Sequence, residues 1–150
     1  MEINKNTDRK ELYGDLILST KNWELFLAPS QTYLGTSVLR LKRDCEGLRS
    51  INTEEWCELK SVIKLIELNY MKTFDLTLFN WACADNASFR EDSVENHSIH
   101  WHIHPRYKNP IVFNGLKFED KEFGYPPQPK KTDLSDKFRK SIIVLIRKNF

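Results

Sequence analysis

The chain lacks the features that mark several classes of protein. Its longest uninterrupted apolar run, residues 142–146, is far short of the ~20 residues that cross a bilayer, and residues 1–10 contain no apolar signal core. Only 5 Gly and 6 Pro occur among its 150 residues, which excludes collagen-like and low-complexity chains. We therefore expect one cytoplasmic domain that spans residues 1–150 and has no membrane partner.

The chain also lacks a large excess of one charge, and it lacks the number and spacing of cysteines that a disulfide framework or a zinc site requires. Lys and Arg total 23 against 21 Asp and Glu, and a net charge of +2 gives no reason to expect nucleic acid as a partner. Cys45, Cys57 and Cys83 are an odd number in no ligand spacing, which argues against a disulfide framework and a zinc ribbon. We expect these three residues to be buried, reduced thiols.

Hydrophobic patterning in the first half of the chain predicts strands followed by a helix. Residues 15–19 and 23–28 are rich in aliphatic and aromatic side chains and predict a β-hairpin, and residues 36–43 alternate as in a third strand. Asn52 or Thr53 can cap a helix through the side-chain oxygen. The apolar stripe of this helix recurs every three or four residues, at Trp56, Leu59, Ile63, Ile66 and Tyr70, and we assign it to the core.

The second half returns to strands and closes with a helix. Residues 74–83 and 97–104 have strand character, and a polar loop lies between them. Residues 109–131 contain scattered Pro and Gly and predict an irregular surface wrap, and a second amphipathic helix follows from Asp133. This order predicts an α+β fold with a mainly antiparallel sheet, one long central helix and a C-terminal helix.

The most informative stretch is a row of alternating histidines. Successive side chains of a strand point to opposite faces, so His100, His102 and His104 share one face of the strand. Such a row can ligate zinc or another transition metal. It can also act on phosphorus, where one imidazole attacks while its neighbours hydrogen-bond the phosphoryl oxygens and the leaving group. The histidine pattern alone leaves both chemistries open.

The surrounding residues resemble the histidine triad (HIT) family of nucleotide-binding proteins. The signature of that family is His-φ-His-φ-His-φ-φ, with φ an apolar residue, often followed by Pro-Arg; residues 100–106 read His-Trp-His-Ile-His-Pro-Arg. The order of the preceding strands and helix also matches, over nearly the whole chain. The sequence looks closest to a bacterial and archaeal branch that reads Asn-Pro-His-Val-His-Trp-His-φ-φ-Pro-Arg-Tyr. The resemblance implies a HIT-like fold.

Two alignments with that branch are open. The first is anchored on residues 105–107, which read Pro-Arg-Tyr. It places Ser98 at the first histidine of the family, His100 at the middle one and His102 at the third. The second alignment uses the three histidines themselves and makes His102 the middle one. We prefer the first alignment because it also keeps Asn96 in place without a deletion.

The resemblance implies a hydrolase or nucleotidyl transferase that uses the middle histidine as its nucleophile and needs no cofactor or metal. By the preferred alignment, His100 attacks the α-phosphorus of a nucleotide conjugate and forms a nucleotidyl-histidine intermediate that water hydrolyses. His102 then hydrogen-bonds the phosphate or the leaving group. The remaining candidates are His104 as a further catalytic residue, and Asn80, Asn96, Ser98 and Arg106 as nucleotide-binding residues.

Two other functions stay open for this sequence, and we expect the chain to form a homodimer. Ser98 and Asp44 stand where the branch has histidines, which favours a nucleotide-binding HIT-like protein with little or no turnover. A metal-binding protein that uses the histidine row is the third possibility. HIT proteins are commonly homodimers, and the apolar segment 142–146 is wider than one buried stripe requires, so we expect a homodimer.

Overall fold

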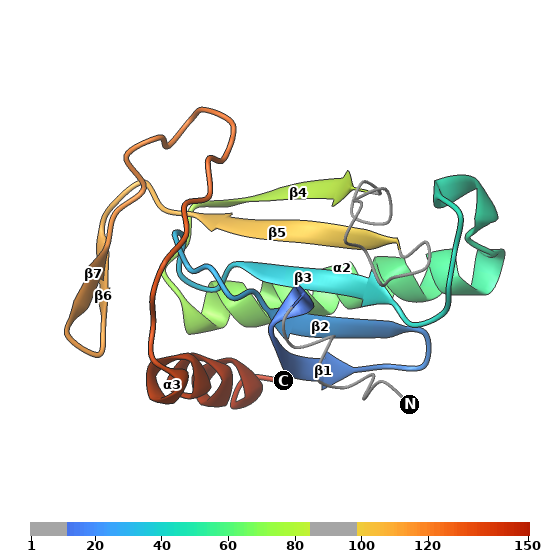
Figure 1. The fold of residues 1–150 in the computed structure, drawn as a ribbon, viewed down its shortest axis with the longest axis horizontal. Helices are drawn as coiled ribbons and strands as arrows, with labels where there is room; N and C mark the ends of the chain where they lie inside the picture. Colours follow the sequence, from blue (N-terminus) through green and yellow to red (C-terminus); the bar gives the residue numbers. More distant parts are fainter. Residues whose placement is uncertain (1–11, 85–98) are drawn as a thin grey trace, which may run out of the picture.

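The fold is an antiparallel sheet backed by one long helix, as expected from the sequence. The structure is a computed structural model that describes residues 12–84 and 99–150. Its main sheet has five antiparallel strands in the order β1-β2-β3-β5-β4, and α2 crosses behind this sheet in Figure 1. The elements of this part are β1 (Asp15–Ser19), β2 (Trp23–Leu27), β3 (Ser37–Leu41), the 3₁₀ turn η1 (Leu48–Ser50), α2 (Thr53–Thr73), β4 (Leu78–Ala84) and β5 (His100–Arg106).

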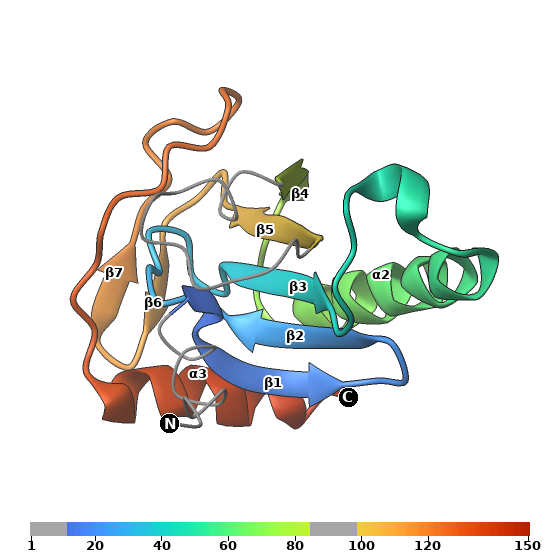
Figure 2. The same cartoon turned by 45° about the vertical axis from the view of Figure 1, so that its right-hand side comes forward.

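A smaller hairpin and a C-terminal helix complete the described chain. They are β6 (Ile111–Phe113), β7 (Leu116–Phe118) and α3 (Asp136–Arg147). Figure 2 shows α3 running alongside β1 at the bottom of the view, and the two elements are in contact. Ile142, Ile143 and Ile146 of α3 are buried in the main core. The expected α+β fold is therefore confirmed, and most of the apolar segment 142–146 is used inside the chain.

Helix α2 begins where the sequence predicts, and most of its expected apolar stripe lies in the core, but the first residue of the stripe does not. The side chain of Asn52 accepts a hydrogen bond from the backbone N–H of Glu55, and the Glu55 carboxylate accepts one from the backbone N–H of Asn52, which forms a capping box. Glu55 is itself buried and pairs with Arg43. Trp56, the next residue, is 41% exposed. The core role expected for Trp56 is wrong because Glu55 takes the inward position at this turn.

The segment after α2 enters the sheet later than expected. The backbone N–H of Phe74 still donates to the carbonyl oxygen of Tyr70, so Phe74 ends the helix, and β4 begins only at Leu78.

The burial of the cysteines also differs from the expected burial. All three cysteines are free, but only Cys45 is buried, and Cys57 is exposed on α2.

The hairpin β6–β7 lies in the segment that the sequence analysis expects to be irregular. Asn114 and Gly115 connect the two strands with φ values of 47° and 80°. Asn and Gly tolerate this left-handed region better than other residues, and Asn-Gly is a strong hairpin signal. The expectation of an irregular wrap over 109–131 was therefore wrong for 111–118, because it weighed the Pro and Gly content and not this dipeptide.

The two faces of the main sheet have different roles. The face that carries Leu25, Leu39 and Ile103 packs into the main core with α2. The opposite face carries a small separate cluster of buried side chains, formed by Tyr13, Phe26, Ala28 and Val38. The histidines of β5 lie on this second face, because His102 pairs with Val38 in the β3–β5 register. Within the described residues, no helix is both long and apolar enough to pass through a membrane.

Candidate functional site

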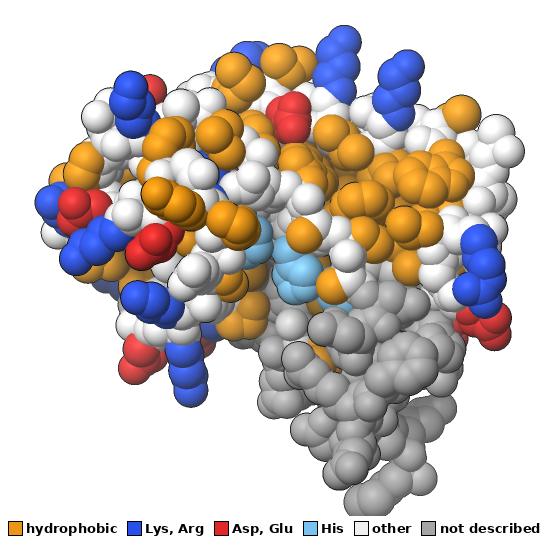
Figure 3. All heavy atoms as spheres, turned by 90° about the horizontal axis from the view of Figure 1, so that it is seen from above, with side chains coloured by type: hydrophobic (Ala, Val, Ile, Leu, Met, Phe, Trp, Pro, Cys, Tyr) orange, Lys and Arg blue, Asp and Glu red, His pale blue; other side chains and the backbone are white. Residues whose placement is uncertain are grey.

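The three histidines of β5 form one continuous row. The ring centroids of His100 and His102 are 5.0 Å apart, and those of His102 and His104 are 6.3 Å apart. His102 is therefore the imidazole that neighbours both of the others. Ile103, which alternates with them, is fully buried in the main core and fixes the strand. The shared face expected from the alternation is present, and the pale blue histidine side chains are visible at the surface in Figure 3.

Burial keeps part of this row uncharged at neutral pH. Burial, and then the neighbouring His100, lower the pKa of His102 below its ordinary value of 6.5. Burial, His102 and Arg106 lower the pKa of His104 to about 4. A neutral imidazole keeps one N–H and has a free lone pair on its other nitrogen, which can attack phosphorus or accept a hydrogen bond. His102 and His104 are therefore neutral imidazoles at pH 7.

His104 is enclosed by protein side chains, as His100 is. It is 7% exposed, and its ring lies edge-on to Tyr33 with centroids 5.9 Å apart. The Nδ1 atom of His104 is buried and has no hydrogen-bond partner among the described residues. Leaving a buried polar atom unpaired costs about 1–3 kcal/mol, and such atoms occur where a ligand or water completes the bonding.

Arg106, expected to bind nucleotide, is fully engaged with protein acceptors. Its guanidinium donates twice to Asp120, at 2.6 and 3.0 Å, and also to Asn80 Oδ1 and to the carbonyl oxygens of Glu122 and Tyr125. These bonds use all five of its N–H groups. Arg106 and Asp120 form a buried ion pair, which raises the pKa of Arg106. A nucleotide contact by Arg106 stays a prediction, and it requires one of these bonds to open.

The remaining predicted site residues divide into two groups. Asn80 of β4 pairs with His104 in the β4–β5 register and so lies beside the histidine row. Its nucleotide-binding role stays a prediction. Asn96 and Ser98 lie outside the described residues. Asp44 follows β3 in an exposed position.

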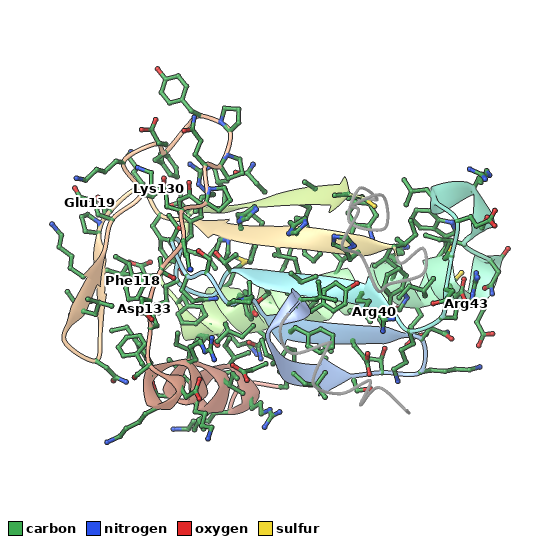
Figure 4. All side chains as sticks on the ribbon, viewed as in Figure 1. Arg40, Arg43, Phe118, Glu119, Lys130 and Asp133 are labelled. Atoms are coloured by element: carbon green, nitrogen blue, oxygen red, sulfur yellow. The ribbon has the colours of Figure 1, made fainter. Side chains whose placement is uncertain are left out.

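Arg40 is a residue beside the row that the sequence analysis did not single out. It pairs with His100 in the β3–β5 register, and its guanidinium carbon lies 5.5 Å from the centre of the Tyr13 ring. Glu24 lies 3.5 Å from Arg40, whose side chain is 6% exposed. In Figure 4 the Arg40 label stands beside the β3 strand. The only signal for Arg40 in the sequence was its charge at an alternating strand position. Its place beside the histidines depends on which strand lies next to β3.

In the described parts of the chain, residues 12–84 and 99–150, no group of three or more His, Cys, Asp or Glu side chains is arranged to hold a metal ion.

The sheet, its helix and the histidine row define a class: the chain has the fold of the histidine triad proteins. A hypothetical histidine triad nucleotide-binding protein from Sulfolobus tokodaii matches with a TM-score of 0.66 and 17% identity, over 96% of this chain and 88% of that chain. A histidine triad protein from Bradyrhizobium japonicum matches with a TM-score of 0.59 and 12% identity, over 99% and 96% of the two chains. The predicted HIT-like fold is thereby confirmed.

One further solved structure with this fold carries a metal. It is a Zn-bound histidine triad family protein from Mycobacterium smegmatis, with a TM-score of 0.55 and 19% identity over 89% of this chain and 81% of that chain. No protein-family model matches the sequence, and no curated protein matches it. The resemblance to a bacterial and archaeal branch stays a prediction.

The lowered pKa of His104 predicts that acid destabilises the fold. The unfolded chain takes up the His104 proton near pH 6.5, whereas the folded chain takes it up only near pH 4. Stability from this group is therefore present above pH 6.5 and is lost as the pH falls from 6.5 to 4. Urea unfolding between pH 7 and pH 4 is expected to show a shallower loss for His104→Gln than for the unmodified protein. Parallel pH profiles for the two proteins would contradict this assignment.

Proposed function

We propose that the protein is a cytoplasmic nucleotide hydrolase or nucleotidyl transferase that attacks the α-phosphorus of a nucleotide conjugate through a histidine. The observation that carries this proposal is the row of three imidazoles, 5.0 and 6.3 Å apart, on one face of a rigid strand. The lowered pKa values of His102 and His104 support it, because neutral imidazoles beside the attacking histidine can donate or accept hydrogen bonds. The neighbouring protein from Sulfolobus tokodaii, described as nucleotide-binding, points the same way.

The proposed reaction has two steps. A nitrogen of His100 forms a bond to the α-phosphorus, and the bond from phosphorus to the leaving group breaks, with its electron pair staying on the leaving atom, which takes a proton from water. Water then attacks the same phosphorus, releases His100 and yields the nucleoside monophosphate. His102 hydrogen-bonds the phosphoryl oxygens or the leaving group in this scheme, and Asn80, Asn96, Ser98 and Arg106 contact the nucleotide.

Nucleotide binding is tested by thermal stability. A purine nucleoside monophosphate binds the native state only, so at a concentration 100 times its dissociation constant it stabilises the fold by about 2.7 kcal/mol. We expect the melting temperature to rise when the nucleotide is added at millimolar concentration, and inosine without phosphate to act far more weakly. The absence of any shift with the monophosphate counts against every nucleotide function proposed for this chain.

A nucleotide-binding protein without turnover is the second candidate, because Ser98 and Asp44 depart from the pattern of the resembling branch. A melting shift together with no release of monophosphate from a panel of phosphoramidate, dinucleoside polyphosphate and nucleotidyl sugar conjugates would favour it. Stoichiometric zinc in protein purified without a histidine tag would instead favour a metal protein, a possibility prompted by the Zn-bound neighbour.

We further propose that the protein is a homodimer that pairs through β4 and α2. β4 is the last strand in the sheet order, and Trp81 of β4 donates to the Glu67 carboxylate of α2 at 3.0 Å, so the two elements meet at this edge. Nearby apolar side chains remain exposed: Leu65 (42%), Leu68 (50%), Met71 (62%) and Leu78 (38%). Figure 3, which looks onto the β4 side, shows a wide area of hydrophobic side chains beside the histidines.

Two matched charge substitutions test this dimer. Met71→Glu places a carboxylate in the proposed interface and is expected to give a monomer mass by light scattering at micromolar concentration. Val144→Glu changes a comparably exposed residue of α3, 67% against 62%, and is expected to leave the dimer intact. A monomer mass for the unmodified protein would refute the dimer.

A further inference from the structure

The chain between β7 and α3 contains a proline-rich stretch to which the proposed reaction gives no role. Residues 125–131 read Tyr-Pro-Pro-Gln-Pro-Lys-Lys. They include the pattern Pro-x-x-Pro-x-Lys, formed by Pro126, Pro129 and Lys131. We call residues 125–131 the PxxP segment. In Figure 1 the chain after β7 rises beyond β4, an edge strand of the sheet, before it returns to α3.

Proline restricts the backbone of the PxxP segment to extended conformations. A proline ring locks its own φ at about −65°, and the residue before a proline is disfavoured in the helical region. Each of residues 125–129 is a proline or precedes one. None of them belongs to a helix or strand of the structure. These constraints favour polyproline II, a left-handed helix with about three residues per turn and no internal hydrogen bonds.

The PxxP segment presents one edge to solvent. A repeat of about three residues per turn places Pro126 and Pro129 on the same edge, and both are exposed. Pro127, which points to another edge, is half-buried. Tyr125, the residue before the first proline, is 70% exposed. The exposed edge therefore carries two dipeptides of the form x-Pro, three positions apart.

The backbone of the PxxP segment keeps acceptors for a partner. In the parts of the chain that the structure describes, no protein donor binds the carbonyl oxygens of residues 126–129. The two ends are nevertheless held. Arg106 donates to the Tyr125 carbonyl oxygen at 2.8 Å, and Thr32 Oγ1 donates to the Lys130 carbonyl oxygen at 2.7 Å. A segment that is already ordered loses little conformational entropy when a partner binds.

Basic side chains follow the prolines. Lys130 and Lys131 are both exposed, and neither pairs with an acid among the residues that the structure describes. Asp133, the next acid along the chain, lies nearer to α3 than Lys130 does in Figure 4. A partner that reads this end of the segment therefore needs a carboxylate.

We propose that the PxxP segment is a docking site for a protein domain of the SH3 kind, with a groove lined by aromatic side chains and carboxylates at one end. The aromatic side chains of the groove receive the two x-Pro dipeptides. Donors of the groove bind the carbonyl oxygens of residues 126–129, and a carboxylate pairs with Lys131. This inference does not depend on the histidine chemistry proposed above.

Binding of the whole protein to an SH3 domain that selects Pro-x-x-Pro-x-Lys ligands tests this site. Calorimetry is expected to give a micromolar dissociation constant for the unmodified protein. Pro129→Ala removes a ring from the exposed edge and should raise that constant about tenfold. Lys131→Glu sets a like charge against the carboxylates of the groove and should raise it by at least as much, about tenfold or more.

Two exposed residues outside the PxxP segment provide matched controls. Pro110→Ala and Lys121→Glu make the same changes at exposed positions and should leave the dissociation constant unchanged. Melting temperatures equal to that of the unmodified protein show that the variants are folded. If Pro129→Ala lowers the melting temperature, Pro126→Ala on the same edge takes its place.

Every other outcome contradicts the docking site. No binding of the unmodified protein at millimolar SH3 domain refutes it. Binding that survives both proline substitutions places the contact elsewhere on the protein. Binding to a WW domain with none to the SH3 domain shows that the partner reads the prolines without Lys131, and the SH3 assignment is then wrong.

Discussion

Replacing His100 by alanine is expected to abolish the nucleotidyl-histidine intermediate and to lower turnover by roughly three orders of magnitude or more. Our proposal assigns this role to His100 because the alignment on residues 105–107 places it at the middle histidine of the resembling family. The intermediate is labile in acid, so it is trapped under alkaline conditions and mapped by mass spectrometry. A modified peptide with the nucleotide on His100 is the expected result.

The other two histidines provide graded controls for this experiment. In the proposed scheme His102, whose ring is 5.0 Å from that of His100, hydrogen-bonds the same phosphate, and His102→Ala should slow turnover by roughly 10². His104 is one position further along the row, beside Tyr33, and His104→Ala should leave substantial activity. Strand residues two apart are separated by about 6.5 to 7 Å, so the ends of the row do not reach one phosphorus atom together. An adduct on His102 would refute the alignment and keep the histidine chemistry.

Removing the Asp120 carboxylate is expected to cause the largest loss of stability. Asp120 and Arg106 are each 1% exposed in their side chains and make two N–H···O bonds. Asp120→Ala leaves a buried guanidinium without its counter-charge, which costs about 3–5 kcal/mol. Urea unfolding at pH 7 measures this cost as a shift of the midpoint.

Glu119, the residue before Asp120, supplies the control for this stability measurement. Glu119 pairs with Lys117 at 3.5 Å, but both side chains are largely exposed, and Figure 4 labels Glu119 beside the β6–β7 hairpin. An exposed pair contributes about 0–1 kcal/mol, so Glu119→Ala should shift the midpoint little. The double variant Arg106→Met with Asp120→Leu should recover part of the loss, because no buried charge is left unpaired. A change below about 1 kcal/mol for Asp120→Ala would show that the pair is not a structural anchor.

The sequence by itself determined the local features of this protein. Strand alternation has a period of two, so it placed His100, His102 and His104 on one face without knowledge of any neighbour. Helix capping is equally local, and Asn52 begins α2 as its side chain predicts. The Asn-Gly turn at 114–115 was also written in the sequence, although the Pro and Gly content of that segment hid it.

Only the tertiary structure decided which groups surround the histidines. Arg40 lies beside His100 because β3 pairs with β5, two strands that are far apart in the sequence. Arg106 meets Asp120 because the chain after β7 folds back over the sheet edge, where residues 124–127 and β4 line a cavity. Strand pairing and loop docking depend on the total apolar surface that the whole core buries. No short stretch of the sequence determines that total. The row of histidines was therefore predictable from the sequence, and its electrostatic and apolar surroundings were not.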